Sequence, residues 1–394
     1  MFRAEGGLYR RQDWLLLGVT LALCGLGVAF IYSASYRGAG MPVQGLWSKQ
    51  LLWVGVGLIV YLVVIQLDPH RLIRAAPFWY GVGIVLLLLV ATMGTELKGG
   101  KRWLDLGVLL LQPSELVKLT NLLLLAYLLG EVDSRPPDLR RVIFCLLLVG
   151  APLVMVMVQP DLGTAMVFLP TAVGVLFLAG MRWRHLFGLA AVALIVLLPV
   201  IVQLIHYDRV FYPILKANPA AEPPGWYLLR PYQCNRVLVF LDPSFETWGA
   251  GWNLLQCKIA VGSGGWAGKG FLRGEQNLLG FLPRPVAPTD FIFSVLAEEL
   301  GFRGVAALLG LYTVLLTRTI WIAFRCRADV AGGLLAGGIA IMFFCHVFVN
   351  VGMTIGLLPI TGLPLPLLSY GGSFMLSTML AIGLVQAVYV RRRP

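Results

Sequence analysis

The amino-acid sequence predicts an all-α polytopic membrane protein with ten transmembrane helices. Three observations lead to this fold class: hydrophobic residues make up 58% of the 394 residues, charged residues make up only 13%, and apolar blocks recur along the whole chain. The mean hydropathy is +0.82. Long apolar runs satisfy their backbone groups in a bilayer by forming helices. We therefore treat residues 1–394 as one integral membrane domain.

The predicted spans follow one another in order along the chain. A helix needs about 20 residues to cross the hydrocarbon core of a bilayer. Apolar blocks of roughly that length lie at 14–36, 46–67, 78–94, 109–129, 141–158, 162–180, 185–205, 290–317, 331–352 and 368–390. The first block is too long for a removable signal peptide and lacks a small-residue cleavage site, so we expect it to remain as an anchor.

One connecting segment differs from the short links between the other spans. Residues 206–289, between the seventh and eighth spans, contain Pro and Gly clusters, mixed charge and many aromatic residues. A segment of this length is usually functional or disordered, and its aromatic residues argue against disorder. We expect a large extracytoplasmic loop, with an amphipathic helix at 251–262 that lies along the membrane interface.

The orientation follows from Lys and Arg, which stay on the cytoplasmic side when they lie in short loops. With the N-terminus inside, sixteen of these residues fall on the cytoplasmic side and five on the outside. The cytoplasmic set is Arg3, Arg10, Arg11, Arg71, Arg74, Arg135, Arg140, Arg141, Arg182, Arg184, Arg318, Arg325, Arg327, Arg391, Arg392 and Arg393; the outside set is Arg37, Lys49, Lys98, Lys101 and Arg102. Both termini are therefore predicted to be cytoplasmic. The net charge of +12 reflects this bias and attraction to anionic lipid, and predicts no nucleic-acid partner.

The cysteines and histidines predict no structural zinc site. The six cysteines form no C-x-x-C pair, and the four histidines are scattered without zinc-ligand spacing. Cys234 and Cys257 share the large loop, where the compartment permits a disulfide, but two cysteines in one loop do not establish the bond. The spacing identifies no metal ligands.

Three carboxylates lie in or beside the apolar stretch "PTDFIFSVLAEELGF", residues 288–302. An ionised group inside hydrocarbon costs on the order of 3 kcal/mol, so such groups are usually paired, hydrated or functional. Asp290 stands at the start of a predicted helix, where it either caps that helix or faces the ligand of the large loop. Glu298 and Glu299 are expected about 12 Å deeper in the same span, as pairing elements.

Three further segments place charge or helix breakers near the outside ends of spans. In "QPSELVK" (112–118), Glu115 and Lys118 share one helix face and can pair, either as a structural ion pair or as a substrate contact. In "QPDLGT" (159–164), Asp161 is predicted to cap the following helix. The Gly-rich "GSGGWAGKG" around Lys269 offers backbone N–H groups and a cation, which suits phosphate, although it is not a P-loop.

Five motifs together carry a resemblance that covers most of the chain. They are "KRWLDLGVLLLQPSELVKL" (101–119), "QPDLGTA" (159–165), "GWNLLQCKIAVGSGGWAGKG" (251–270), "TDFIFSVLAEELGFRG" (289–304) and "NVGMTIGLLPITGLPLPLLSYGGS" (350–373). With them the sequence resembles the SEDS family (shape, elongation, division and sporulation). The third motif, followed by "FLP", is more similar to the elongation branch, RodA, than to the division branch, FtsW.

The resemblance implies a peptidoglycan glycosyltransferase that polymerises lipid II at the outer face of the bacterial inner membrane during cell-wall elongation. It implies a class B penicillin-binding protein and other membrane proteins of the elongation complex as partners. The essential aspartate of the family matches Asp290, to which we assign the role of general base on the 4-hydroxyl of an acceptor GlcNAc. Glu115 and Lys118 match the family's cavity pair, and Arg102 matches the basic residue of its "RW" motif. Lys118, Arg102 and Lys269 are our candidates to offset the charge of the leaving undecaprenyl pyrophosphate, and together with Glu115 they form the predicted substrate-binding set. No nucleotide is needed, and Mg²⁺ or Mn²⁺ is a candidate cofactor.

The chain departs from the family pattern just before Asp290. Where the family has "FLPExHTDF", this chain has "FLPRPVAPTDF", with Arg284 in the Glu position, Pro288 in the His position and two extra residues. Cys257 and Glu275 also replace the family's Ser and Thr. Any helper role of the missing His and Glu is therefore in doubt for this chain.

Two other classes of function remain open from the sequence. A flippase for lipid-linked precursors would also have many spans and a polar cavity, but we would expect its charges through the full depth of the membrane. A non-catalytic scaffold for the penicillin-binding protein would leave Asp290 dispensable. The clustering of charge toward the outside ends favours the enzyme.

Overall fold

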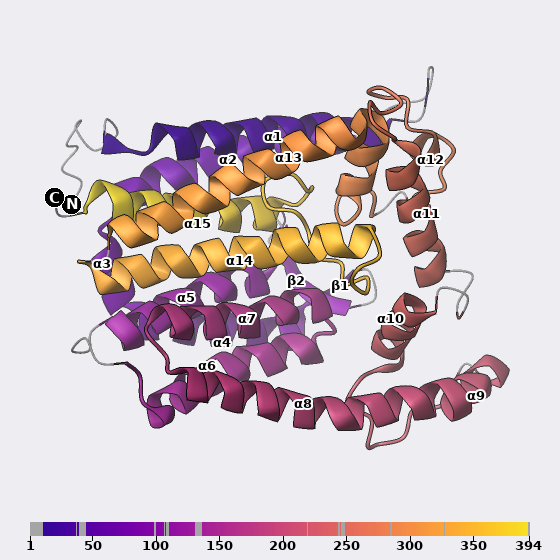
Figure 1. Cartoon of the computed structure of the whole chain (residues 1–394), viewed down its shortest axis with the longest axis horizontal. Helices are drawn as coiled ribbons and strands as arrows, with labels where there is room; N and C mark the ends of the chain where they lie inside the picture. The colour runs from indigo at the N-terminus through magenta and orange to yellow at the C-terminus, as the bar shows by residue number, and fades with distance from the viewer. Residues whose placement is uncertain are drawn as a thin grey trace.

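The computed structural model of the chain is a bundle of long helices with a helical region across one end (Figure 1). It describes residues 11–36, 38, 45–97, 100–105, 107, 110–130, 136–218, 220–242, 245, 249–283, 286–326 and 328–392. The residues discussed above that lie outside this description are Arg3, Arg10, Arg37, Lys98, Arg135, Arg284, Arg327 and Arg393.

The long helices follow the order of the predicted spans. They are α1 (Trp14–Ser35), α2 (Leu46–Gln66), α4 (Ala76–Met93), α5 (Pro113–Gly130), α6 (Leu139–Val158), α7 (Leu162–Leu178), α8 (Trp183–His206), α13 (Ile292–Arg325), α14 (Val330–Thr354) and α15 (Gly372–Val390), with the short α3 (Pro69–Arg74) after α2. Within the described residues, eight stretches are long and apolar enough to cross a membrane, and α5 and α7 are not among them. The helix α7 is apolar but has only 17 residues. A total of ten spans therefore stays a prediction.

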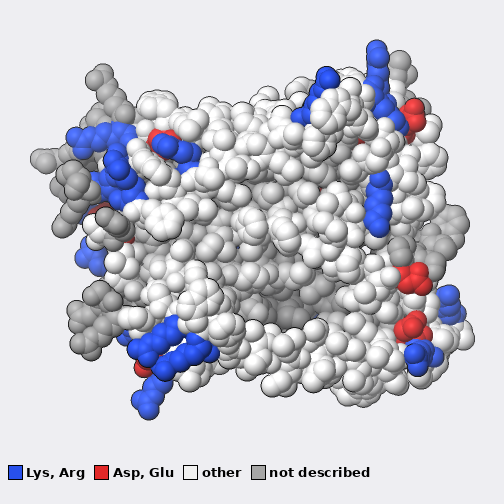
Figure 2. Space-filling view, in the orientation of Figure 1, with Lys and Arg blue, Asp and Glu red and all other residues white. Residues whose placement is uncertain are grey.

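The start of α1 and the end of α15 lie at the same end of the bundle, which we call the terminal end. The backbone N–H of Asp13 donates to Gln386 Oε1 at 2.9 Å, and Arg391 Nη1 donates to the carbonyl of Ile65 at 2.6 Å. The opposite end, which carries the segment 206–289, is the loop end. Figure 2 shows Lys and Arg gathered toward the two ends, with an uncharged band between them. Such a band is typical of a helix bundle in a bilayer.

A small sheet at the loop end corrects the all-α prediction. Strands β1 (Thr95–Leu97), β2 (Gly100–Asp105) and β3 (Leu110–Leu111) pair antiparallel in the order β1-β2-β3. The predicted span 109–129 was therefore placed too early, because residues 110–111 pair with β2 and α5 begins only at Pro113. Proline suits the first turn of a helix, where its missing N–H has no partner to lose.

The helix α13 changes direction at Gly301, where φ is 62° and ψ is −161°. This conformation is open to glycine because it lacks a Cβ. The expectation that Glu298 and Glu299 lie deeper in one continuous span is wrong. The Glu299 carboxylate accepts a hydrogen bond from Ser33, two residues before α1 ends at the loop end of the bundle. Both glutamates therefore lie at the loop end.

The Gly-rich segment 264–270 packs against this break. The N–H groups of Lys269 and Gly270 donate to the carbonyls of Glu298 and Glu299 at 3.0 and 2.9 Å. A Cβ added at Gly268, whose φ is +80°, would lie 2.1 Å from the carbonyl oxygen of Glu299. The glycines thus permit one backbone to pack on another, and two N–H groups of the predicted phosphate nest, those of Lys269 and Gly270, already donate to α13.

The described part of the segment 206–289 contains several short helices. It contains the π-helix η2 (Tyr207–Phe211), α9 (Tyr212–Ala217), α10 (Pro231–Leu241), α11 (Ala250–Ser263) and α12 (Glu275–Leu278). Figure 1 shows α10 and α11 running across the end of the bundle, at a steep angle to its long helices. The predicted helix at 251–262 is confirmed as α11, and its direction agrees with a helix that lies along the membrane interface.

Candidate active site

A cavity of about 600 Å³ opens at the loop end of the bundle. Its wall is formed by β2 and β3, by the first two turns of α2, by the starts of α5, α7 and α15, and by the segments before α13 and α15. The residues that line it are Lys49, Leu52, Trp53, Arg102, Trp103, Leu110, Gln112, Glu115, Asp161, Thr164, Thr289, Asp290, Gly362, Pro364, Tyr370, Gly371, Gly372, Ser373 and Phe374. Four charged residues from three of the quoted sequence motifs therefore meet around one space: Arg102, Glu115, Asp161 and Asp290.

Asp290 is half-buried in the wall of this cavity and is held through its backbone. Its N–H donates to the carbonyl of Val286 at 2.8 Å, and its own carbonyl accepts from Asn350 Nδ2 at 2.8 Å. A Cβ added at Gly362 would lie 3.3 Å from Asp290 Oδ2, and the φ of Gly362 is +80°. The helix α13 begins at Ile292 with Phe291 in the N-cap position, so Asp290 is not its cap. That alternative is wrong.

Asp161 caps α7, as its position in the sequence predicts. Its carboxylate accepts from the N–H of Thr164 at 3.2 Å and from Thr164 Oγ1 at 2.9 Å. Gln112 Nε2, from the segment before α5, donates to the same carboxylate at 2.9 Å. Arg102 Nη1 lies 3.9 Å from Asp161 Oδ1, and its Nε donates to the carbonyl of Gln159 at 3.3 Å. The cap therefore also fixes Arg102 at the cavity wall.

The predicted contact between Glu115 and Lys118 is confirmed. Lys118 Nζ lies 2.9 Å from Glu115 Oε1, and the two side chains are only 3% and 4% exposed. Ser377 on α15 donates to the second oxygen, Glu115 Oε2, at 3.3 Å. Glu115 lines the cavity, whereas Lys118 lies behind it. The pair therefore presents its carboxylate to the cavity and keeps its ammonium inside the protein.

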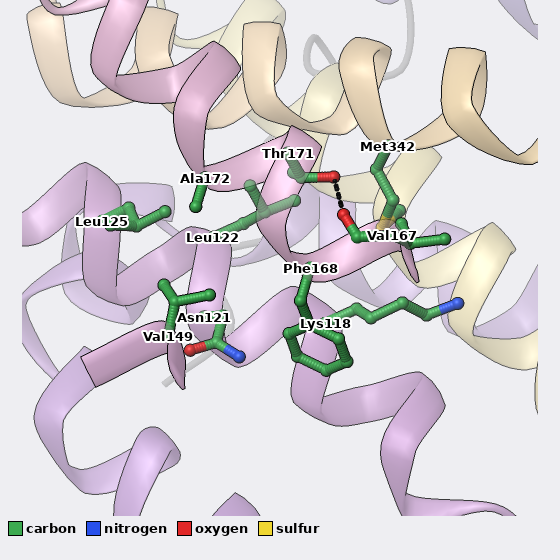
Figure 3. A pocket seen from close by; sticks show the side chains of 10 residues that line it. All are labelled: Lys118, Asn121, Leu122, Leu125, Val149, Val167, Phe168, Thr171, Ala172 and Met342. Carbon is green, nitrogen blue, oxygen red and sulfur yellow. Dashed lines mark hydrogen bonds between the residues drawn. The ribbon is translucent and has the colours of Figure 1, made fainter. Parts of the chain in front are cut away.

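A second, much smaller cavity of about 10 Å³ lies along the stem of Lys118 (Figure 3). Its lining is mostly apolar, and in Figure 3 the ammonium of Lys118 points away from Asn121. Asn121 is 4% exposed, and neither atom of its amide has a hydrogen-bond partner among the described residues. A space of this size holds a single water molecule at most, so it is not a substrate site.

Lys269 forms a separate cluster with Glu298 and Glu275, and none of the three lines the cavity. Lys269 Nζ lies 2.9 Å from the fully buried Glu298 and 3.1 Å from the exposed Glu275. Burial lowers the pKa of Lys269, but the hydrogen bonds that its ammonium donates to Glu298 and Glu275 outweigh this effect, so the net pKa is raised. Lys269 thus serves as the counter-ion of Glu298 in this structure, and its predicted contact with substrate is untested.

Two residues near the site were missed in the sequence. Arg236 on α10 donates through Nη1 to the carbonyl of Thr361 at 3.0 Å. Burial lowers the pKa of Arg236, and the nearby Tyr232, Asp290 and Asp161 offset this only in part, with Arg102 acting in the same direction as burial. His346 on α14 lies 2.8 Å from Lys118 through its Nε2. No local signal identifies either residue, because each reaches the site through a contact with a distant part of the chain.

The cysteines of the loop region are free thiols. All six cysteines of the chain lie in the described residues, and none forms a disulfide. Burial raises the pKa of Cys234 to about 11 and that of Cys257 to about 12. Because the thiolate is the reactive form, both side chains act as small buried groups.

Comparison with known proteins agrees with this arrangement along the whole chain. The model of the cell cycle protein family FtsW, RodA and SpoVE matches residues 13–393. The chain is 39% identical over 381 residues to peptidoglycan glycosyltransferase MrdB of Escherichia coli strain K12, covering 97% of this chain and 94% of that protein. It is 35% identical over 427 residues to peptidoglycan glycosyltransferase RodA of Treponema pallidum strain Nichols, covering 96% and 98%.

Among solved structures, the chain is similar to one described as "Structural coordination of polymerization and crosslinking by a peptidoglycan synthase complex". The TM-score is 0.76 at 34% identity, and the match covers 97% of this chain and 98% of the other. Sequence and fold thus agree over nearly the full length, and the chain belongs to the family of cell cycle proteins formed by FtsW, RodA and SpoVE.

Proposed function

We infer that this chain is a peptidoglycan glycosyltransferase that polymerises lipid II into glycan strands during cell-wall elongation. The observation that carries this inference is the cavity of about 600 Å³ where Asp290, Glu115 and Arg102 meet. Its volume lies within the usual range of sites for small molecules, about 300–1,000 Å³. The relatives that match over nearly the whole chain are named peptidoglycan glycosyltransferases.

In the proposed reaction, Asp290 is the general base. A bond forms between the 4-hydroxyl oxygen of an acceptor GlcNAc and C1 of a donor MurNAc, while the bond from C1 to undecaprenyl pyrophosphate breaks. A hydroxyl is a poor nucleophile, and a positioned carboxylate that takes its proton contributes about 10²–10⁴-fold. Asp290 suits this role because hydrogen bonds with Val286 and Asn350 fix its backbone N–H and carbonyl, and because it lines the cavity.

Cationic side chains are proposed to offset the negative charge that develops on the leaving pyrophosphate. Arg102 and Lys49 line the cavity, and Arg236 interacts electrostatically with Asp290 and Asp161. Lys118 acts from behind Glu115, 2.9 Å away. In this proposal Lys269 is structural, because it is already paired with Glu298 and Glu275.

We propose that the loop end faces the extracytoplasmic side of the bacterial inner membrane. The excess of Lys and Arg in the short loops of the opposite side supports this orientation. A class B penicillin-binding protein and other membrane proteins of the elongation complex are the proposed partners. The solved relative supports a transpeptidase partner, since its description joins polymerization and crosslinking in one synthase complex.

The function is tested by supplying purified lipid II to the protein, alone and with its partner, and separating the products by size. We expect glycan polymer, at least when the partner is present. A parallel liposome assay measures movement of labelled lipid II between leaflets. Translocation of lipid II without any polymer would show that the chain is a flippase and not the polymerising enzyme. Polymer made only by the partner would show that the chain is a non-catalytic scaffold.

A divalent cation is a separate proposal for the substrate-bound enzyme. No three His, Cys, Asp or Glu side chains in the described ranges are grouped as a metal site. Mg²⁺, however, is often bound through one or two carboxylates together with substrate phosphates, and Asp290, Asp161 and Glu115 line the cavity. We expect EDTA to lower polymer formation and Mg²⁺ or Mn²⁺ to restore it. An unchanged rate in EDTA would show that the basic side chains alone offset the negative charge on the leaving pyrophosphate.

A further inference from the structure

His346 lies between the Glu115–Lys118 ion pair and the wall of the cavity. It is 1% exposed, on α14. Its Nε2 lies 2.8 Å from Lys118 Nζ, and its Nδ1 lies 3.1 Å from the carbonyl oxygen of Pro364. Pro364 and Glu115 both line the cavity. One imidazole therefore joins the buried ammonium to the backbone of the segment that forms the cavity wall.

The two neighbours determine the tautomer of His346. An ammonium group has only donors, so Nε2 of His346 must accept a hydrogen bond from Lys118. The carbonyl of Pro364 can only accept, so Nδ1 must carry the ring hydrogen. The imidazole is therefore neutral, because a second ring proton would point at the ammonium. In this form it accepts from one partner and donates to the other, which keeps both in fixed positions.

The next turn of α14 holds the same wall segment. Asn350, four residues after His346 and so on the same face of the helix, donates through Nδ2 to the carbonyls of Leu363 and Asp290, at 2.6 and 2.8 Å. His346 thus holds Pro364 while Asn350 holds Leu363 and the backbone of Asp290. Gly362, whose Cα faces the Asp290 carboxylate, lies in the same segment.

We propose that His346 is a positioning residue for glycan transfer: its neutral imidazole fixes Lys118 beside Glu115 and ties that pair to the cavity wall at Pro364. This inference rests on the proposed glycosyltransferase function. His346 lies outside the lining of the large cavity, so it acts through Lys118 and Pro364 rather than on substrate. Losing either hydrogen bond should move the pair relative to Asp290.

The test compares His346→Leu with His346→Gln in the complex with the partner. Leucine fills a similar space without polar atoms, whereas the Gln amide can accept from Lys118 and donate to Pro364. We expect His346→Leu to lower kcat about 10–100-fold with little change in KM, because small misplacements in a site can cost about that much. His346→Gln should recover most of the rate. Equal rates in unchanged protein and His346→Leu would overturn the proposal, as would a well-folded His346→Gln as slow as His346→Leu.

His185→Leu is the matched control, because His185 is also a buried histidine but lies at the start of α8, outside the cavity lining. It should polymerise at the unchanged rate.

A double variant tests whether His346 acts through Lys118. If it does, adding His346→Leu to Lys118→Met should slow transfer no further. Additive losses would overturn that route.

Two outcomes separate this inference from the proposed function. If the unchanged complex makes no polymer from lipid II, the glycosyltransferase function fails. If it makes polymer and the leucine variant equals it, only the role of His346 fails. Should His346→Leu not be obtained as folded protein, His346→Met removes the same two hydrogen bonds with a more adaptable side chain, and the same rates decide.

Discussion

Replacing Asp290 with Asn is expected to lower lipid II polymerisation by about 10²–10⁴-fold, the usual contribution of a general base. The amide is close in size to the carboxylate and leaves the backbone bonds to Val286 and Asn350 in place. It cannot take a proton from the acceptor hydroxyl. The measurement is the initial rate of polymer formation by the purified complex, with lipid II binding recorded separately to show that the cavity remains intact.

The matched control for this substitution is Asp138→Asn. Asp138 caps α6 at the terminal end of the bundle, and asparagine caps a helix about as well as aspartate. That variant should polymerise normally. Substantial polymer from a well-folded Asp290→Asn protein would remove Asp290 as the base. If the Asp290→Asn protein still binds the partner and the complex forms polymer at the unchanged rate, the result would support the alternative in which this chain is a non-catalytic scaffold.

Replacing Lys118 with Met is expected to destabilise the protein and to slow polymerisation. The substitution leaves the Glu115 carboxylate buried without its cation, and breaking a buried ion pair on one side costs about 3–5 kcal/mol. Removing a charge that favours the transition state typically lowers rates about 10²–10³-fold. Thermal melting in detergent measures the first effect, and polymer formation from lipid II measures the second.

The double variant Lys118→Met with Glu115→Gln separates the two effects. The neutral amide removes the unpaired charge, and Ser377 remains beside it, so we expect the melting temperature to recover. Polymerisation should stay low if the charge of Lys118 contributes to transfer. A double variant that melts and polymerises like the unchanged chain would show that the ion pair is only structural.

Local sequence pattern predicted the features that depend on neighbouring residues. The i, i+3 spacing of Glu115 and Lys118 predicted their contact, and the position of Asp161 before an apolar run predicted its cap on α7. Both interactions close within one helical turn, so the residues that form them are visible together in the sequence. The apolar blocks likewise predicted the order of the long helices.

Features that depend on distant contacts were missed or placed wrongly. The turn of α13 at Gly301 requires the backbone of the segment 264–270 against it, and the span pattern continues through that glycine without a break. Residues 110–111 pair as a strand with β2, so α5 starts later than the apolar pattern predicted. Arg236 and His346 carry no motif of their own, and each is recognised only through its partners, Thr361 and Lys118.

The sequence by itself determined that this is a membrane helix bundle of a known family, and it predicted a set of charged site residues. Only the tertiary structure decided that Asp290, Glu115, Asp161 and Arg102 surround one cavity while Lys269 pairs with Glu298 outside its lining. The physical reason is range: hydropathy and helix capping act within a few residues, whereas a cavity is formed by segments that meet only when the whole bundle packs.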